Sequence, residues 1–172
     1  IPKTWDDVLA AIPILQANNM QIGMHTDYKI FMYQMGGELF ADEGMRINLD
    51  SQIGLAAFTK MCNMFTKYSF PYSFDAANRF RTGEMPIVIG DYATTYNTLV
   101  VYATELGGMW EFCPLPGCEV MDPETKKPVV DPVSGKKVLN YDSLANVTAT
   151  VLLYGCKNVK AAWAYLQWQT DE

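Results

Sequence analysis

One stretch in the middle of the chain, residues 78–92, constrains the fold more than any other. It opens with a helical pattern for which Asp75 is the expected N-cap, and Gly83 stands where a helix needs a left-handed closing residue. Residues 87–89, Ile-Val-Ile, form a β-branched run typical of a strand covered on both faces. Residues 90–92, Gly-Asp-Tyr, then place a carboxylate and an amphipathic ring at the end of that strand. Because open α/β sheets bind ligands at the carboxyl ends of their strands, this corner is the first candidate site.

The rest of the chain alternates between helical patterns and short strand patterns. Helices are predicted over about 5–15, from Thr26 or Asp27 to Met35, over 51–68, from Tyr92 to about Leu106, and over 159–166; strands are predicted over 21–24, 87–89, 109–113 and 147–154. Residues 39–49 read as two short extended pieces around a turn. This alternation predicts an α/β layered domain with a mostly parallel sheet flanked by helices.

Composition narrows the class of protein. A net charge of −6 and a pI near 4.7 argue against nucleic acid or an anionic membrane as the partner, since both require a positive surface. The single histidine makes a histidine-based metal site improbable, and we expect no cofactor. Four cysteines (Cys62, Cys113, Cys118 and Cys156) lack the spacing of a metal site, so they are predicted to be buried free thiols, or to include one disulfide if the protein is exported.

Five motifs resemble those of the extracellular solute-binding proteins of bacterial ABC importers, of the maltose-binding type. In chain order they are Pro2-Lys3-Thr4-Trp5-Asp6-Asp7, Gly36-Gly37-Glu38-Leu39-Phe40, Phe80-x-x-Gly83-Glu84-x-x-Ile87-x-Ile89, Pro114-Leu115-Pro116-Gly117, and Ala161-Ala162-Trp163-Ala164-Tyr165-Leu166 with Trp168 and Thr170 following. The resemblance spans nearly the whole chain. Only a segment rich in proline and lysine, residues 119–142, falls outside it, and its turn signals predict a solvent-exposed excursion.

The resemblance implies a fold and a role. It implies that residues 1–172 are a single α/β lobe of a type II periplasmic-binding-protein fold, the second of two lobes, with the first lobe missing from this chain. It also implies an exported setting, either periplasmic or as a lipid-anchored lipoprotein, although no signal peptide is present in the sequence. The expected ligand is a carbohydrate-class solute, which the protein would deliver to an ABC import permease. No enzymatic activity is expected.

The candidate ligand-binding residues are polar or aromatic side chains at predicted strand ends, where sugar hydroxyls find hydrogen-bond partners and sugar C–H faces find rings. They are Asp91, Tyr92, Tyr96 and Asn97 after the 87–89 strand, His25 and Tyr28 after the 21–24 strand, and Ser143 and Asn146 before the last strand. For each, the alternative is an ordinary structural role, as a helix cap, a packed ring or a turn residue.

Two other functions remain open from the sequence. A glycoside hydrolase would need two carboxylates with different pKa values, and Asp91 with Asp27 or Glu84 is a conceivable pair. The sequence has no nucleophile elbow, P-loop, dinucleotide fingerprint or zinc-protease motif. A ligand-sensing domain of a receptor or regulator could use the same fold, because fold does not fix function.

Overall fold

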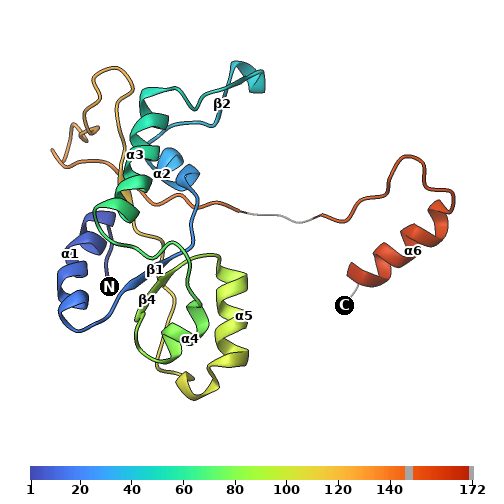
Figure 1. Cartoon of the computed structure of the whole chain (residues 1–172). Helices are drawn as coiled ribbons and strands as arrows, with labels where there is room; N and C mark the ends of the chain where they lie inside the picture. Colours follow the sequence, from blue (N-terminus) through green and yellow to red (C-terminus); the bar gives the residue numbers. More distant parts are fainter. Residues whose placement is uncertain (146–148, 171–172) are drawn as a thin grey trace.

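The computed structural model describes residues 1–145 and 149–170 as a mixed α/β chain (Figure 1). The α-helices are α1 (Trp5–Ala17), α2 (Tyr28–Gln34), α3 (Gln52–Thr66), α4 (Ala76–Arg81), α5 (Tyr92–Tyr102) and α6 (Val159–Thr170). The strands are β1 (Ile22–Met24), β2 (Phe40–Ala41), β3 (Arg46–Ile47), β4 (Ile87–Ile89), β5 (Cys118–Glu119) and β6 (Leu139–Asn140), and two 3-10 turns, η1 (Asp42–Gly44) and η2 (Thr104–Leu106), complete the elements. The α/β class predicted from the sequence is confirmed.

The centre of the fold is the parallel pair β1–β4, in the register Ile22↔Ile87, Gly23↔Val88 and Met24↔Ile89. All three residues of β1 are buried, whereas β4 buries only Ile89 fully. Gly23 is required here because a Cβ at this position would lie 2.6 Å from the ring of Phe74. The expected parallel pairing is therefore present, although it joins two strands only.

Helices α1 to α4 each begin at an N-cap side chain that accepts a backbone N–H, as predicted for Asp75. Thr4 and Asp7 form a reciprocal capping box at the start of α1, and Ser51, Asp75 and Asp27 cap α3, α4 and α2. Gly83 has φ +79° after α4, as expected for a left-handed closing residue.

The remaining strands form antiparallel hairpins. β2 pairs with β3 in the 39–49 segment, as two extended pieces around the turn η1. β5 pairs with β6, and the bridges Met121↔Pro128 and Val130↔Lys137 continue the pairing through residues 119–142. Val133, in this segment, is 94% exposed.

The structure corrects five details of the sequence-based prediction. Residues 109–113 form no strand, since they pair with no neighbour, and α5 ends at Tyr102, before the 3-10 turn η2. Residues 149–154 are not a strand, and Val147 and Thr148 lie outside the described residues. α6 buries no residue, so the inward face expected for it is absent. The four cysteines are free, but only Cys118 is buried, where burial raises the pKa of its thiol to about 11.

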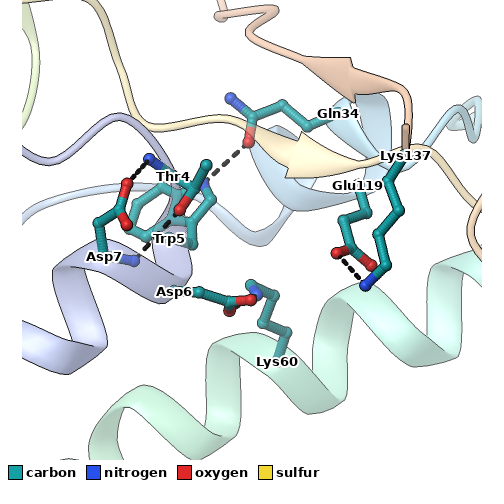
Figure 2. A network of polar contacts seen from close by, with 8 residues as sticks. All are labelled: Thr4, Trp5, Asp6, Asp7, Gln34, Lys60, Glu119 and Lys137. Atoms are coloured by element: carbon teal, nitrogen blue, oxygen red, sulfur yellow. Dashed lines mark hydrogen bonds and ion pairs between the residues drawn. The ribbon is translucent and has the colours of Figure 1, made fainter. Parts of the chain in front are cut away.

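The buried side chain of Gln34 joins segments that are far apart in the sequence. The Gln34 side chain, fully buried, accepts from Trp5 Nε1 at 2.9 Å and donates through Nε2 to the carbonyls of Pro116 and Asp142, both at 3.0 Å. Figure 2 shows the Trp5–Gln34 bond beside the Thr4–Asp7 capping box. We call these four residues, Trp5, Gln34, Pro116 and Asp142, the Gln34 staple, because they tie the starts of α1 and β5 to the end of α2 and to the segment after β6.

Candidate functional site

The candidate site lies at the carboxyl edge of the β1–β4 pair. The strands are parallel, so the segments that follow them leave the sheet at the same edge. The backbone N–H of His25 donates to the carbonyl of Ile89 at 2.7 Å, which extends the pairing by one residue beyond β1. A Cβ built on Gly90 would lie 3.6 Å from His25 Cβ. The two loops predicted to carry ligand contacts therefore meet at this edge.

Asp91 is the N-cap of α5 and is exposed to solvent. Its Oδ1 accepts the backbone N–H of Thr94 at 2.8 Å. That backbone hydrogen bond is the main reason why the pKa of the Asp91 carboxyl lies below its ordinary value. Asp91 is consequently an ionised acceptor at neutral pH, and the capping role named as its alternative in the sequence is present in the structure.

Tyr92 and Tyr96 stand one turn apart on α5 and stack on each other, with ring centroids 5.6 Å apart and an interplanar angle of 14°. Phe112 lies against both rings, at centroid distances of 4.8 Å from Tyr92 and 5.6 Å from Tyr96. Trp110 meets Phe112 edge-on at 5.3 Å and Phe80 at 6.4 Å. These five residues form what we call the aromatic cluster.

The aromatic cluster is open to solvent on one side. Tyr92 is 64% exposed, Phe112 43% and Tyr96 39%. Rings in a hydrophobic core are normally covered, so an exposed, mutually stacked set next to a strand edge is a surface suited to bind a ligand with an apolar face.

The residues after β1 have different partners. His25 stacks on Phe74, with centroids 4.1 Å apart, and Tyr28 meets Phe58 of α3 edge-on at 6.1 Å. Asp27, between them, caps α2 and forms an ion pair with Lys29 at 2.9 Å. The hydroxyl of Thr26 is buried and has no hydrogen-bond partner among the described residues. The structure therefore brings His25 to the same edge as Gly90 but gives Tyr28 a separate aromatic contact.

The remaining candidates show no particular arrangement. Asn97 and Ser143 are exposed, and Asn146 lies outside the described residues. The described part of the chain contains no cluster of three His, Cys, Asp or Glu side chains that could hold a metal ion. A groove of about 580 Å³ lies between α1, α3 and residues 121–126, and none of the predicted site residues lines it.

Sequence reasoning missed Trp110 and Phe112. Both fall in the segment predicted as a strand over 109–113, where alternate residues point to the same side. Their spacing of two was thus a usable signal that the two rings share one face. The contact with Tyr92 and Tyr96 depends on how the chain returns past α5 after η2, which no local pattern specifies.

Glu84 is excluded as a partner of Asp91 in an acid–base pair. Its carboxylate bonds Arg79 Nε at 2.8 Å, and Arg79 also donates to Gln21 Oε1 at 2.9 Å. Glu84 precedes β4 whereas Asp91 follows it, so the two carboxylates lie at opposite ends of the strand. Gly83 and Glu84 are both explained locally, Gly83 by the end of α4 and Glu84 by its ion pair with Arg79.

The fold is that of a mixed α/β protein in which the segments after the two parallel strands leave the sheet at one edge. More specifically, the chain belongs to the bacterial extracellular solute-binding protein family, whose sequence model matches residues 2–172. No curated protein and no solved structure matches the chain. Members of this family are the extracellular or periplasmic solute-binding proteins of ABC importers, so they bind a small molecule, have an ABC permease as partner and are in general not enzymes.

Among the described helices, none is both long and apolar enough to cross a bilayer.

Proposed function

We propose that this chain is one lobe of a two-lobed protein that captures a carbohydrate-class solute and delivers it to an ABC import permease. The first lobe would supply the opposite wall of the site, and closure of the two lobes would enclose the ligand. A lipid anchor or free diffusion in the periplasm would both be compatible with the role.

The observation that carries the proposal is the open aromatic cluster beside an ionised carboxylate. A pyranose ring presents C–H groups on its faces and hydroxyl groups at its rim. The exposed ring of Tyr92 can pack against the C–H groups of the sugar, and the carboxylate of Asp91 can accept hydrogen bonds from its hydroxyl groups. A charged ligand such as a polyamine would favour several carboxylates around the rings, and on this edge Asp91 and the lysine-paired Asp27 are the acidic side chains of the two loops.

The same geometry supports binding without catalysis. A glycosidase needs one carboxyl group with a raised pKa to act as general acid. Here the hydrogen bond from Thr94 lowers the pKa of Asp91, Asp27 is held by Lys29, and Glu84 is paired with Arg79 at the other end of β4.

A thermal-shift screen of the full-length protein tests this proposal. Mono- and oligosaccharides form the test panel, and peptides and polyamines are the controls. A ligand that binds the native state raises the melting temperature by mass action, by an amount that grows with its concentration above Kd. We expect a rise with one group of sugars. A rise with peptides or polyamines alone would keep the solute-binding fold and contradict the carbohydrate class.

A further inference from the structure

We infer that the groove between α1, α3 and residues 121–126 is a second ligand site, and that it takes a small amphipathic anion. Its volume of about 580 Å³ is within the range of small-molecule pockets. None of the residues named for the sugar site lines this groove, so the inference is independent of the proposed import function. Two features carry it: a sequence repeat that is broken where it meets the groove, and a half-buried lysine.

The wall formed by residues 121–126 belongs to a tandem repeat of nine residues. Residues 121–129, Met-Asp-Pro-Glu-Thr-Lys-Lys-Pro-Val, align with residues 130–138, Val-Asp-Pro-Val-Ser-Gly-Lys-Lys-Val. The backbone repeats as well, because in each unit the N–H of the aspartate donates to the carbonyl five residues later, at 2.9 Å in the first unit and 2.8 Å in the second. The same turn is therefore built twice, and the two units can be compared position by position.

Three valines at the ends of the units join in a closed ring of backbone hydrogen bonds. The N–H of Val129 donates to the carbonyl of Val120 at 2.8 Å, that of Val138 to Val129 at 2.9 Å, and that of Val120 to Val138 at 2.9 Å. Val120 directly follows β5 and Val138 directly precedes β6. The ring thus ties both hairpins to the β5–β6 pair, which gives the first hairpin a defined position as a wall of the groove.

The repeat is broken at the residue that reaches the groove. The sixth position of each unit has a left-handed backbone, with φ 59° at Lys126 and φ 67° at Gly135. Glycine adopts this conformation at little cost, whereas a lysine is strained there. Lys126 lines the groove, and Gly135 does not. Because left-handed non-glycine residues concentrate at functional sites, the difference between the units indicates a binding role for the Lys126 side chain.

Lys60 of α3 supplies a second cation to the same groove. Its side chain is only 24% exposed, although lysines are rarely covered to this extent without a close partner. The nearest carboxylate oxygen, Oδ1 of Asp6, is 4.0 Å from Lys60 Nζ, at the outer limit of an ion pair (Figure 2). The ammonium group therefore keeps donors for an anion bound in the groove.

Two carboxylates also line the groove, but neither competes strongly for the site. The side chain of Asp6 is 80% exposed, so its charge is screened by solvent. Asp122 Oδ1 accepts the backbone N–H groups of Glu124 at 2.9 Å and Thr125 at 2.7 Å, which engages this carboxylate in the turn.

The groove also has an apolar part, contributed by Leu9, Ile53, Ala56, Met64 and Met121. Apolar surface of this kind binds a hydrocarbon body, while ammonium groups form their strongest hydrogen bonds with anionic oxygens. The combination selects a molecule with an apolar body and one anionic group.

The test is a fluorescence titration of the full-length protein with anilinonaphthalene sulfonate, an amphipathic anion, and with its uncharged analogue N-phenylnaphthylamine. We expect saturable binding of both. The variant Lys60→Gln/Lys126→Gly should raise the Kd of the sulfonate about tenfold, because it removes both charged donors, and should leave the Kd of the analogue unchanged. Lys126→Gly introduces the residue of the second unit at this position, so the melting temperature should not fall.

Two control variants locate the bound probe. Lys136→Gln/Lys157→Gln removes the same charge from exposed lysines that do not line the groove, and it should leave both Kd values unchanged. Tyr92→Ala should also leave the Kd of the sulfonate unchanged, because Tyr92 does not line the groove either. A Kd that depends on Tyr92 and not on the two lysines would place the probe on the aromatic cluster and overturn the inference.

The remaining outcomes are equally decisive. Equal weakening of both probes by Lys60→Gln/Lys126→Gly would mean that the lysines shape the groove without selecting an anion, which contradicts the ligand class. An absence of saturable sulfonate binding, or a Kd that is the same in this variant as in the wild type, would overturn the site itself. These results leave the proposed import function standing, since that function is tested separately by the response of the melting temperature to sugars.

Discussion

The Gln34 staple and the aromatic cluster both combine rings with polar groups, but those groups are buried in the staple and exposed in the cluster. In the staple, the carboxamide of Gln34 is fully buried and its oxygen and nitrogen both have partners within the protein. In the aromatic cluster, Tyr92 contacts the rings of Tyr96 and Phe112 and is still 64% exposed, next to the exposed carboxylate of Asp91. A polar group that is already satisfied inside the protein contributes to stability, whereas an exposed ring beside an ionised acceptor is free to contact a ligand. The comparison therefore predicts that changes in the staple alter unfolding, and changes in the cluster alter binding.

The largest expected effect is on stability, from Trp5→Ala. Trp5 is 1% exposed and lies 4.6 Å from the ring of Phe31, so its removal leaves a cavity and unpairs Gln34. We expect the free energy of unfolding to fall by about 3–5 kcal/mol in denaturant titrations. Tyr102→Ala, at a 70% exposed ring, should change it by less than about 0.5 kcal/mol. A small effect of Trp5→Ala on the free energy of unfolding would contradict the placement of Trp5 in the hydrophobic core.

A smaller loss of stability is expected from Gln34→Leu. This change introduces an apolar side chain of similar size and leaves the indole N–H of Trp5 and the carbonyls of Pro116 and Asp142 without their partner. Unsatisfied buried groups of this kind cost about 1–3 kcal/mol. Gln167→Leu, at an exposed position, is the matched control. If both variants unfolded at the same denaturant concentration, the staple would have no structural role.

The variant Phe112→Ala should weaken ligand binding while changing stability little. Phe112 contacts both Tyr92 and Tyr96 and is 43% exposed, so its removal loosens the stack and shrinks the surface offered to a sugar. Because aromatic pairs contribute about 0.5–1.5 kcal/mol, we expect the Kd for the solute to rise about two- to tenfold in calorimetric titrations. The melting temperature without ligand should change much less than in Trp5→Ala. The reverse pattern, with unfolding affected and binding untouched, would make the cluster a structural feature.

The smallest effect concerns pH. Backbone hydrogen bonds from Thr4 and Lys3 lower the pKa of Asp7 in the folded protein. A carboxyl group whose folded pKa is depressed contributes stability above its unfolded pKa, about 3.9, and this contribution disappears as pH falls through the folded value. The stability difference between wild type and Asp7→Ala should therefore be present at pH 7 and shrink below about pH 4. A difference that is independent of pH over this range would mean that the capping box does not act through the carboxylate.

The sequence predicted those parts of the molecule that depend on local chemistry. Asp75 caps α4 as expected, and the helices predicted over about 5–15 and 51–68 begin at the caps Thr4 and Ser51, because a side chain that bonds its own helix start needs no distant partner. The β-branched run 87–89 identified β4, and the parallel pairing of β1 with β4 brings His25 to Gly90.

What the sequence could not predict depends on which segments meet. The 109–113 segment has a strand-like composition but finds no strand to pair with, and instead presents Trp110 and Phe112 to α5. Similarly, the residue type of Gln34 gives no sign that its carboxamide joins the start of α1 to residues more than 80 positions further along the chain. In both places the deciding contacts are between side chains far apart in sequence.

The central claim is that the open face of Tyr92 binds the solute, and the most direct test is a calorimetric titration of full-length Tyr92→Ala with the sugar that gives the largest thermal shift. Tyr102→Ala, which removes another exposed ring of the same helix, serves as the control. We predict that Tyr92→Ala raises Kd about tenfold, equivalent to about 1.4 kcal/mol, with an unchanged melting temperature in the absence of sugar. An unchanged Kd for Tyr92→Ala, at wild-type stability, would contradict the assignment of this edge as the binding site.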